Sequence, residues 1–275
     1  MSLKLNMVKL ALLILTMTLV VYCGDSSEPE ETSWEMIWQD EFEGPQGQAP
    51  DPTKWVYDTW GNGSGWGNNQ LEYNSNRPEN VSLDGAGHLA IVARKEFYEG
   101  LNYTSARIKT EALFEVTYGR IEARMRMPYG QGLWPAFWML GNDIGSVSWP
   151  RCGEIDIMEY RGQEPSIIHG TLHGPGYSGG RAVGTSYTLS NARFDTEFYT
   201  FAIEWDQDSI NWYVDDELYQ TLTPNDVPGD WAYDHPFFIL LNLAVGGGFV
   251  GSPNESTTFP QTLLVDYVRV YQEAE

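Results

Sequence analysis

Apolar residues alternate with polar ones in a succession of short segments along the chain. Residues 119–127 (Gly-Arg-Ile-Glu-Ala-Arg-Met-Arg-Met) show this best, because Ile, Ala and Met take every second position between charged residues. A period of two places the apolar side chains on one face of a β-strand. Further segments of strand character are 88–95, 134–140, 154–160, 167–173, 198–205, 210–214, 218–222, 237–244 and 263–271.

Turn residues separate these segments, for example Asp84-Gly85 and Asp215-Asp216. Sustained apolar periodicity near 3.6, the mark of an amphipathic helix, is lacking, so we expect few and short helices. Many short strands with turn signals between them predict an all-β fold, a sandwich or a barrel. Residues 34–272 contain neither an internal repeat nor a linker, which predicts one domain there.

The N-terminal residues 1–22 have the pattern of a signal peptide. Lys4 and Lys9 precede an apolar run over residues 10–22 that is too short to cross a bilayer comfortably. Cys23 then opens a lipoprotein-like sequence, although Tyr22 stands where a small residue is expected before an acylated cysteine. The polar, acidic residues 23–33 predict a tether. We therefore expect a folded domain over residues 34–275 in an exported protein, secreted or lipid-anchored at the cell envelope through Cys23.

The composition limits the partners of the chain. There are 38 acidic and 16 basic residues, giving a formal net charge of −22. Such a field repels polyanions, which argues against nucleic acid and favours an uncharged ligand. The chain also has 11 Trp, 16 Tyr and 11 Phe, more aromatic residues than a core requires. Some of these rings are expected on a binding surface, because flat aromatic rings stack on the apolar faces of sugars.

Three carboxyl groups lie on the apolar strand predicted over residues 154–160 (Glu-Ile-Asp-Ile-Met-Glu-Tyr). Strict alternation would put Glu154 and Asp156 on one face and bury Glu159 on the other, at several kcal/mol. One extra residue at Ile157–Met158, a β-bulge, would return Glu159 to the face of its partners. Clustered carboxyl groups raise one another's pKa values, so one can keep a proton while another is an anion. Glycoside hydrolysis uses such a pair.

Two alternatives apply to this strand. Its acidic residues could belong to a solvated acidic coat, although their apolar flanks and nearby Trp residues argue against that. They could instead form a metal site, and the candidate ligands would be Glu154, Asp156, Glu159, His169 and His173. The two histidines do not fit a metal-binding helix pattern such as H-E-x-x-H, so we prefer the hydrolytic interpretation.

The block from Trp149-Pro150 through Gly153-Glu154-Ile-Asp156-Ile-Met-Glu159 resembles the signature E-[IL]-D-[IVAF]-x-E of glycoside hydrolase family 16, in its laminarinase-like members. The resemblance covers nearly the whole mature chain. Further matching blocks are residues 38–44, 65–69, 103–107, 118–124, 133–140, 169–173, 201–205, 242–247 and 265–272. It implies a β-jelly-roll sandwich of two antiparallel sheets, with a concave face forming a substrate cleft.

The resemblance also implies an activity, an endo-acting retaining β-glucanase. Its expected substrates are β-1,3-glucan (laminarin) and mixed-linkage β-1,3-1,4-glucans (lichenan, cereal β-glucan), cleaved through a covalent glycosyl-enzyme intermediate without a catalytic cofactor. Glu154 would be the nucleophile, Glu159 the general acid and then base, and Asp156 a hydrogen-bond partner of the nucleophile. The implied substrate-binding residues are Asn69, Arg107, Trp134, Trp138, Trp149 and His173.

Simpler roles exist for several of these residues. Asn69 could satisfy a turn, Arg107 could pair with a surface acid, and at least one of the three Trp residues should lie in the core. Two departures from the family pattern stand out. Phe249 follows the glycines where a Trp is frequent, and Gln70 and Glu72 exchange the usual order of Glu and Gln.

Family members often hold a structural calcium ion, and the candidate ligands here are Glu43, the Gly87 carbonyl and Asp266. Oxygen donors from distant segments suit calcium, although these could be ordinary surface acids. Two other functions remain open: a non-catalytic glucan-binding jelly-roll module, and a sibling hydrolase of galactans or carrageenan. We expect a monomer that binds neutral β-glucan.

Overall fold

The computed structural model describes residues 33–60 and 65–274. The predicted signal peptide, Cys23 and all but the last residue of the tether therefore lie outside the described residues. Ser33–Glu275 form one compact unit. Within the described part of the chain, no helix combines the length and apolar character needed to cross a membrane.

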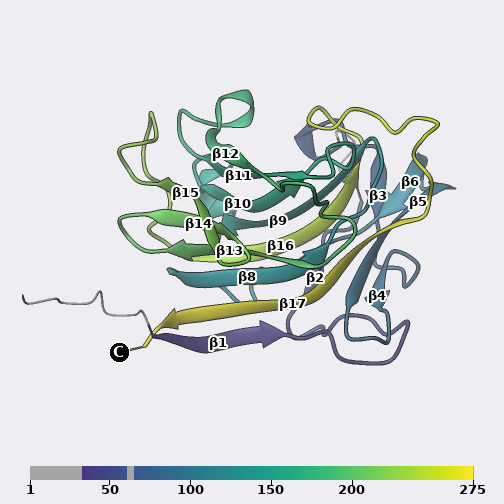
Figure 1. Cartoon of the computed structure of the whole chain (residues 1–275), viewed down its shortest axis with the longest axis horizontal. Coiled ribbons are helices and arrows are strands. Elements are labelled where there is room, and N and C mark those ends of the chain that lie inside the picture. The colour runs from purple at the N-terminus through teal and green to yellow at the C-terminus, as the bar shows by residue number, and fades with distance from the viewer. Residues whose placement is uncertain (1–32, 61–64, 275) are drawn as a thin grey trace, which may run out of the picture. The chain divides into compact units, whose positions relative to one another are not determined.

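Two stacked β-sheets make up this unit (Figure 1). The larger sheet has ten strands in the order β15-β14-β13-β8-β17-β5-β6-β3, with β1 beside β17 and β4 beside β5. Its strands are β1 Trp34–Asp40, β3 Glu72–Asn74, β4 Val81–Leu83, β5 Leu89–Tyr98, β6 Leu101–Ser105, β8 Gly119–Arg126, β13 Tyr199–Trp205, β14 Ile210–Val214, β15 Glu217–Leu222 and β17 Gln261–Glu273.

The smaller sheet has seven strands in the order β12-β11-β10-β9-β16-β7-β2. These are β2 Val56–Tyr57, β7 Arg107–Lys109, β9 Leu133–Gly141, β10 Glu154–Tyr160, β11 Ile167–His173, β12 Val183–Thr188 and β16 Phe237–Val245. The helical elements among the described residues are α1 Ile144–Val147 and two 3-10 turns, η1 Gly65–Gly67 and η2 Gly179–Arg181. The predicted all-β sandwich with short helices is confirmed.

Each predicted segment corresponds to a strand, and the limits of 154–160, 167–173 and 210–214 match β10, β11 and β14. The strands without a predicted counterpart are β1, β12 and the short strands β2, β3, β4, β6 and β7. Short strands depend on pairing with distant partners rather than on their own alternation. One pair differs from the antiparallel expectation, because β3 runs parallel to β6.

The hydrophobic core fills the space between the two sheets. From β8, Ile121, Ala123 and Met125 are fully buried, as their alternation predicts. From the smaller sheet, Ile155 of β10 is also fully buried. The opposite face of the seven-stranded sheet, which we call the site face, points away from this core and carries the carboxyl groups described next.

Candidate active site

The predicted β-bulge is present in β10. In the pairing of β10 with β9, Asp156 faces Trp138 and Met158 faces Phe137, so Ile157 is an extra residue. The register with β11 shifts at the same place. Ile157 and Met158 both enter the core, and Glu159 consequently returns to the site face. The bulge thus resolves the conflict between strand alternation and burial of a carboxyl group.

Each of the two glutamates of the strand accepts a hydrogen bond from a different tryptophan. Trp149 Nε1 donates to Glu154 Oε2 at 2.9 Å, and Trp134 Nε1 donates to Glu159 Oε1 at 3.1 Å. An indole N–H can only donate, so each contact stabilises the anionic form of its glutamate. Asp156 lies between the two glutamates and is 2% exposed.

His173 of β11 faces the carboxyl groups from the neighbouring strand. Its Nε2 lies 3.1 Å from Asp156 Oδ2 and 3.6 Å from Glu154 Oε1. The backbone N–H of Gly179 donates to His173 Nδ1 at 3.1 Å. Because Nδ1 accepts this bond, the proton of the neutral ring sits on Nε2 and points toward the carboxylates.

Burial dominates the electrostatics of the cluster. Loss of solvent raises the pKa of Glu154, Asp156 and Glu159 above their ordinary values, and the negative charge of Asp156 raises the pKa of both glutamates further. The positive charge of a protonated His173 and the indole hydrogen bonds act in the opposite direction. The cluster therefore retains protons at a pH where exposed carboxyl groups have lost theirs, as a general acid requires.

A tryptophan beneath the sheet supports the bulge, a role that no local pattern of residues predicts. Trp212 of β14 is fully buried, and its Nε1 donates to the backbone carbonyl of Asp156 at 3.0 Å. Gly170 of β11 leaves room for this ring, because a Cβ there would lie 2.6 Å from Trp212 Cδ1. The core of one sheet thus fixes the strand that carries the carboxyl groups of the other.

Arg107 lies further along the site face, on β7. Its guanidinium stacks over Trp138 at 4.7 Å and over Trp66 at 4.5 Å, and its Nε lies 3.0 Å from Asp58 Oδ2. Trp138 Nε1 donates to Asn242 Oδ1 at 2.8 Å. Arg107 therefore has the acidic partner that its simpler role requires, and it also forms an ordered aromatic platform beside the carboxyl groups. The sequence interpretation missed Asp58 and Asn242.

The remaining predicted binding residues differ in their setting. Trp134 and Trp138 are half-buried on the site face and Trp149 is 45% exposed. The expectation that one of these three Trp residues lies in the core is wrong, because each uses its N–H on the site face. Asn69 is exposed in the loop after η1 with a left-handed φ of 60°, so its role in substrate binding stays a prediction. Glu72 is buried instead, and its Oε2 accepts a hydrogen bond from the backbone N–H of Val245.

The structure brings together three of the five candidate ligands of the alternative metal site. Within the described residues, the side chains spaced to hold a metal ion are Glu154, Asp156 and His173, whose ligand atoms lie within 4.8 Å of one another. Glu159 and His169 do not join this group, because Glu159 pairs with Trp134 and His169 packs against Phe249. Within the group, His173 Nε2 lies close to both carboxylates, 3.1 Å from Asp156 Oδ2 and 3.6 Å from Glu154 Oε1.

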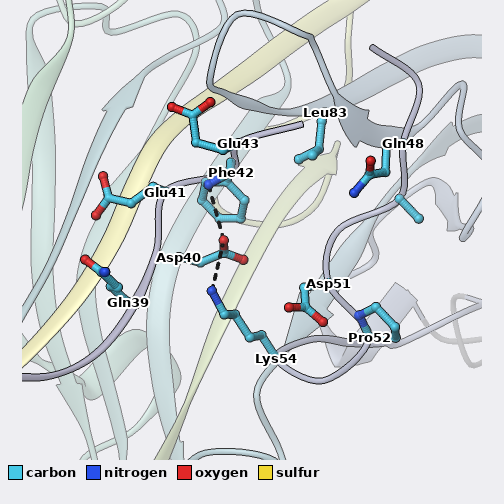
Figure 2. A pocket seen from close by; sticks show the side chains of 11 residues that line it. Gln39, Asp40, Glu41, Phe42, Glu43, Gln48, Asp51, Pro52, Lys54 and Leu83 are labelled. Atoms are coloured by element: carbon cyan, nitrogen blue, oxygen red, sulfur yellow. Dashed lines mark hydrogen bonds and ion pairs between the residues drawn. The ribbon is translucent and has the colours of Figure 1, made fainter. Parts of the chain in front are cut away.

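The calcium candidates lie on the larger sheet and its loops. Glu43 lines a pocket of about 380 Å³, and its carboxylate points away from the buried Asp40, which pairs with Lys54 (Figure 2). The Glu43 carboxylate lies beside Gly87. Asp266 occupies a bulge of β17 and pairs with Arg124. The Glu43 carboxylate and residue Gly87 are thus neighbours, while Asp266 already has a cationic partner that calcium would displace.

A two-sheet jelly-roll with clustered carboxyl groups on its exposed face defines a glycoside hydrolase. Residues 63–269 match the model for glycosyl hydrolases family 16, and the chain belongs to this family. It is 42% identical to a β-glucanase of Rhodothermus marinus, over 100% of this chain and 98% of that protein.

Solved structures agree with this assignment. The laminarinase catalytic domain of Thermotoga maritima superposes with a TM-score of 0.83 at 45% identity, covering 88% of this chain and 99% of that one. A non-specific family 16 endo-β-1,3(4)-glucanase superposes with a TM-score of 0.80 at 38% identity, covering 90% and 98%. That structure presents a 1,3-β-D-cellobiosyl-glucose at its active site.

Proposed function

We propose that this chain is an endo-acting glucanase that hydrolyses β-1,3-glucan and mixed-linkage β-1,3-1,4-glucan. The similarity to β-glucanases, laminarinases and a non-specific endo-β-1,3(4)-glucanase supports it. The single observation that carries the proposal is the cluster on β10, in which two indole-bonded glutamates flank a buried aspartate across a bulge.

Glu154 is the proposed nucleophile, an assignment that rests on the family resemblance. Its carboxylate attacks the anomeric carbon to form a glycosyl-enzyme ester, while Glu159 gives its proton to the leaving glycosidic oxygen. Glu159 then removes a proton from the water that hydrolyses the ester. Each of the two displacements inverts the anomeric carbon, so the overall configuration is retained. The negative charge of Asp156 raises the pKa of Glu154. The Nε2–H of His173 helps to orient Glu154, because this nitrogen lies 3.6 Å from Glu154 Oε1 and 3.1 Å from Asp156 Oδ2.

The substrate is proposed to be uncharged. The net charge of −22 opposes sulfated or carboxylated chains, and the Trp138–Arg107 platform offers a ring and hydrogen-bond donors to a glucosyl unit. The carboxyl groups lie on β10 and the platform lies on β9 and β7 of the same sheet, so a glucan chain would cross the strands of the site face.

Product analysis on laminarin, lichenan, agarose, carboxymethylcellulose and xylan tests the proposal. We expect oligosaccharides from laminarin and lichenan and none from the other three. Glu154→Gln and Glu159→Gln should each lower turnover on laminarin by a factor of about 10²–10⁴ with an unchanged melting temperature. Glu217→Gln, at an exposed position of β15, is the matched control. Laminarin binding without products would instead indicate a glucan-binding module, and activity on agarose would indicate a galactan hydrolase.

Three further proposals concern the protein as a whole. We propose export, secreted or with Cys23 as a lipid anchor, on the pattern of residues 1–23. We propose a structural calcium ion at Glu43, Gly87 and Asp266, which would stabilise the fold and take no part in the chemistry. We also propose that the protein acts as a monomer.

A further inference from the structure

Phe249 occupies the position where family members often have a Trp, and its surroundings give it a role. The ring follows the glycine turn after β16. Its centroid lies 5.1 Å from that of Trp134 on β9 and 5.4 Å from that of His169 on β11. These two strands flank β10, and His169 stands directly opposite Glu159 in the register. Phe249 therefore spans the strand beside Glu159 without belonging to the carboxyl cluster.

Arg161, two residues beyond Glu159, holds Phe249 from another side. Its Cζ lies 4.0 Å from the centroid of the Phe249 ring. The guanidinium Nε is buried and has no hydrogen-bond partner, and a terminal nitrogen lies 3.4 Å from Glu164. The Arg161 side chain is 31% exposed, and a cation that is partly shielded from water gains more from an aromatic face than a fully exposed one does. The Arg161–Phe249 contact is thus a fixed part of the site wall.

The Trp134 indole lies between the Phe249 ring and the backbone of the glycine turn. A Cβ at Gly247 would lie 3.3 Å from Trp134 Cζ3, so the backbone of the turn packs on the indole. Phe249 contacts the same ring. With these contacts, the Trp134 N–H is aimed at Glu159 Oε1. Without the Phe249 ring beside it, the Trp134 indole can rotate about its side-chain torsions. The hydrogen bond to Glu159 would then be lost for part of the time.

We propose that Phe249, clamped by Arg161, is a positioning residue for Glu159 and acts by fixing the Trp134 indole. The proposal rests on the proposed role of Glu159 as general acid and base. The effect of Phe249 is confined to proton transfer, and attack by Glu154 is left intact.

A comparison of leaving groups isolates that step. From a 2,4-dinitrophenyl β-laminarioligoside, the leaving group departs as the stable dinitrophenolate and needs no proton. The sugar leaving group of a laminarioligosaccharide must be protonated by the acid. Because kcat/KM covers only the steps through cleavage of the glycosidic bond, it reports the acid role for both substrates. For Phe249→Ala, we expect kcat/KM to fall about 10–100-fold on the oligosaccharide and less than about threefold on the aryl substrate. Phe97→Ala, on an exposed phenylalanine of β5, is the control and should change neither.

Two further variants separate positioning from general damage. Phe249→Trp keeps an aromatic ring at this position. It should therefore retain most of the kcat/KM on the oligosaccharide that Phe249→Ala loses. Arg161→Lys keeps the charge and loses the planar stack, so it should resemble Phe249→Ala. If Phe249→Ala melts below the assay temperature, Phe249→Leu replaces it, because Leu keeps apolar volume without an aromatic face.

The pH profile gives an independent readout. The charged or titratable groups that face Glu159 are Asp156, His173 and Arg161, with His169 opposite on β11. The Trp134 hydrogen bond lowers the pKa of Glu159, so losing it should move the basic limb of kcat/KM to higher pH in Phe249→Ala.

Each outcome decides one question. Equal losses on both substrates, or none on either, would overturn the positioning role of Phe249. The proposed role of Glu159 fails separately if Glu159→Gln shows the same loss on the aryl substrate as on the oligosaccharide, because Glu159 would then not be the acid. The proposed function itself fails if the wild type releases no products from laminarin.

Discussion

Removing the charge of Asp156 should make the protein more stable at high pH. Asp156→Asn keeps the shape of the side chain and an oxygen that can accept a bond from His173 Nε2–H. Burial raises the pKa of Asp156 from 3.8 to about 8. At about 1.4 kcal/mol per pKa unit, ionising this buried group costs at most about 6 kcal/mol. The contact with His173 offsets part of that cost, so we expect a net gain of about 1–4 kcal/mol for the variant.

The sign follows from proton binding. The folded-state pKa lies above the unfolded value, so the contribution of the carboxyl group to stability is fully present below about pH 4 and lost as the pH rises through about 8. The asparagine does not titrate. The two proteins should therefore have similar free energies of unfolding at pH 4, and the variant should be the more stable one at pH 9.

Urea unfolding of both proteins at pH 4, 6, 8 and 9 measures this difference, with Asp216→Asn, in the exposed turn between β14 and β15, as the matched control. A second readout is activity. The charge of Asp156 raises the pKa of Glu154 and Glu159, so its removal should shift the basic limb of kcat to lower pH. A stability difference that is the same at pH 4 and pH 9, or a wild type that is more stable at pH 9, would refute the burial argument.

Two other predictions concern the supports of the fold. Trp212→Phe leaves the backbone carbonyl of Asp156 without its buried donor. We therefore expect the free energy of unfolding to fall by about 2–4 kcal/mol and kcat on laminarin to be lower. Unchanged urea unfolding would show that the bulge does not need this hydrogen bond. Calcium should raise the melting temperature of EDTA-treated protein by a few degrees without changing kcat, and Asp266→Asn should abolish the shift; a wild type indifferent to calcium would exclude the site.

Much of the fold is encoded locally. The period of two in residues 119–127 and 210–214 follows from the backbone geometry of a strand, so the alternation alone predicts β8 and β14 and the faces they bury. The bulge in β10 is also a local property, because a buried Glu159 would conflict with the hydrophobic sequence around it. The family signature adds which glutamate is expected to act as the nucleophile.

The partners of the carboxyl groups are decided by tertiary structure. Trp134 reaches Glu159 across 25 positions and Trp212 reaches Asp156 across 56, and no local pattern fixes the strand register that brings them together. Burial of the cluster, and with it the raised pKa values, likewise exists only once strand pairing has placed Trp134, Trp149 and His173 around the carboxyl groups. The placement of three carboxyl groups on one face of a strand could be predicted from the residues of β10 alone. The folded sheets decided what each of them contacts, because contacts between distant strands depend on pairing and packing rather than on local sequence.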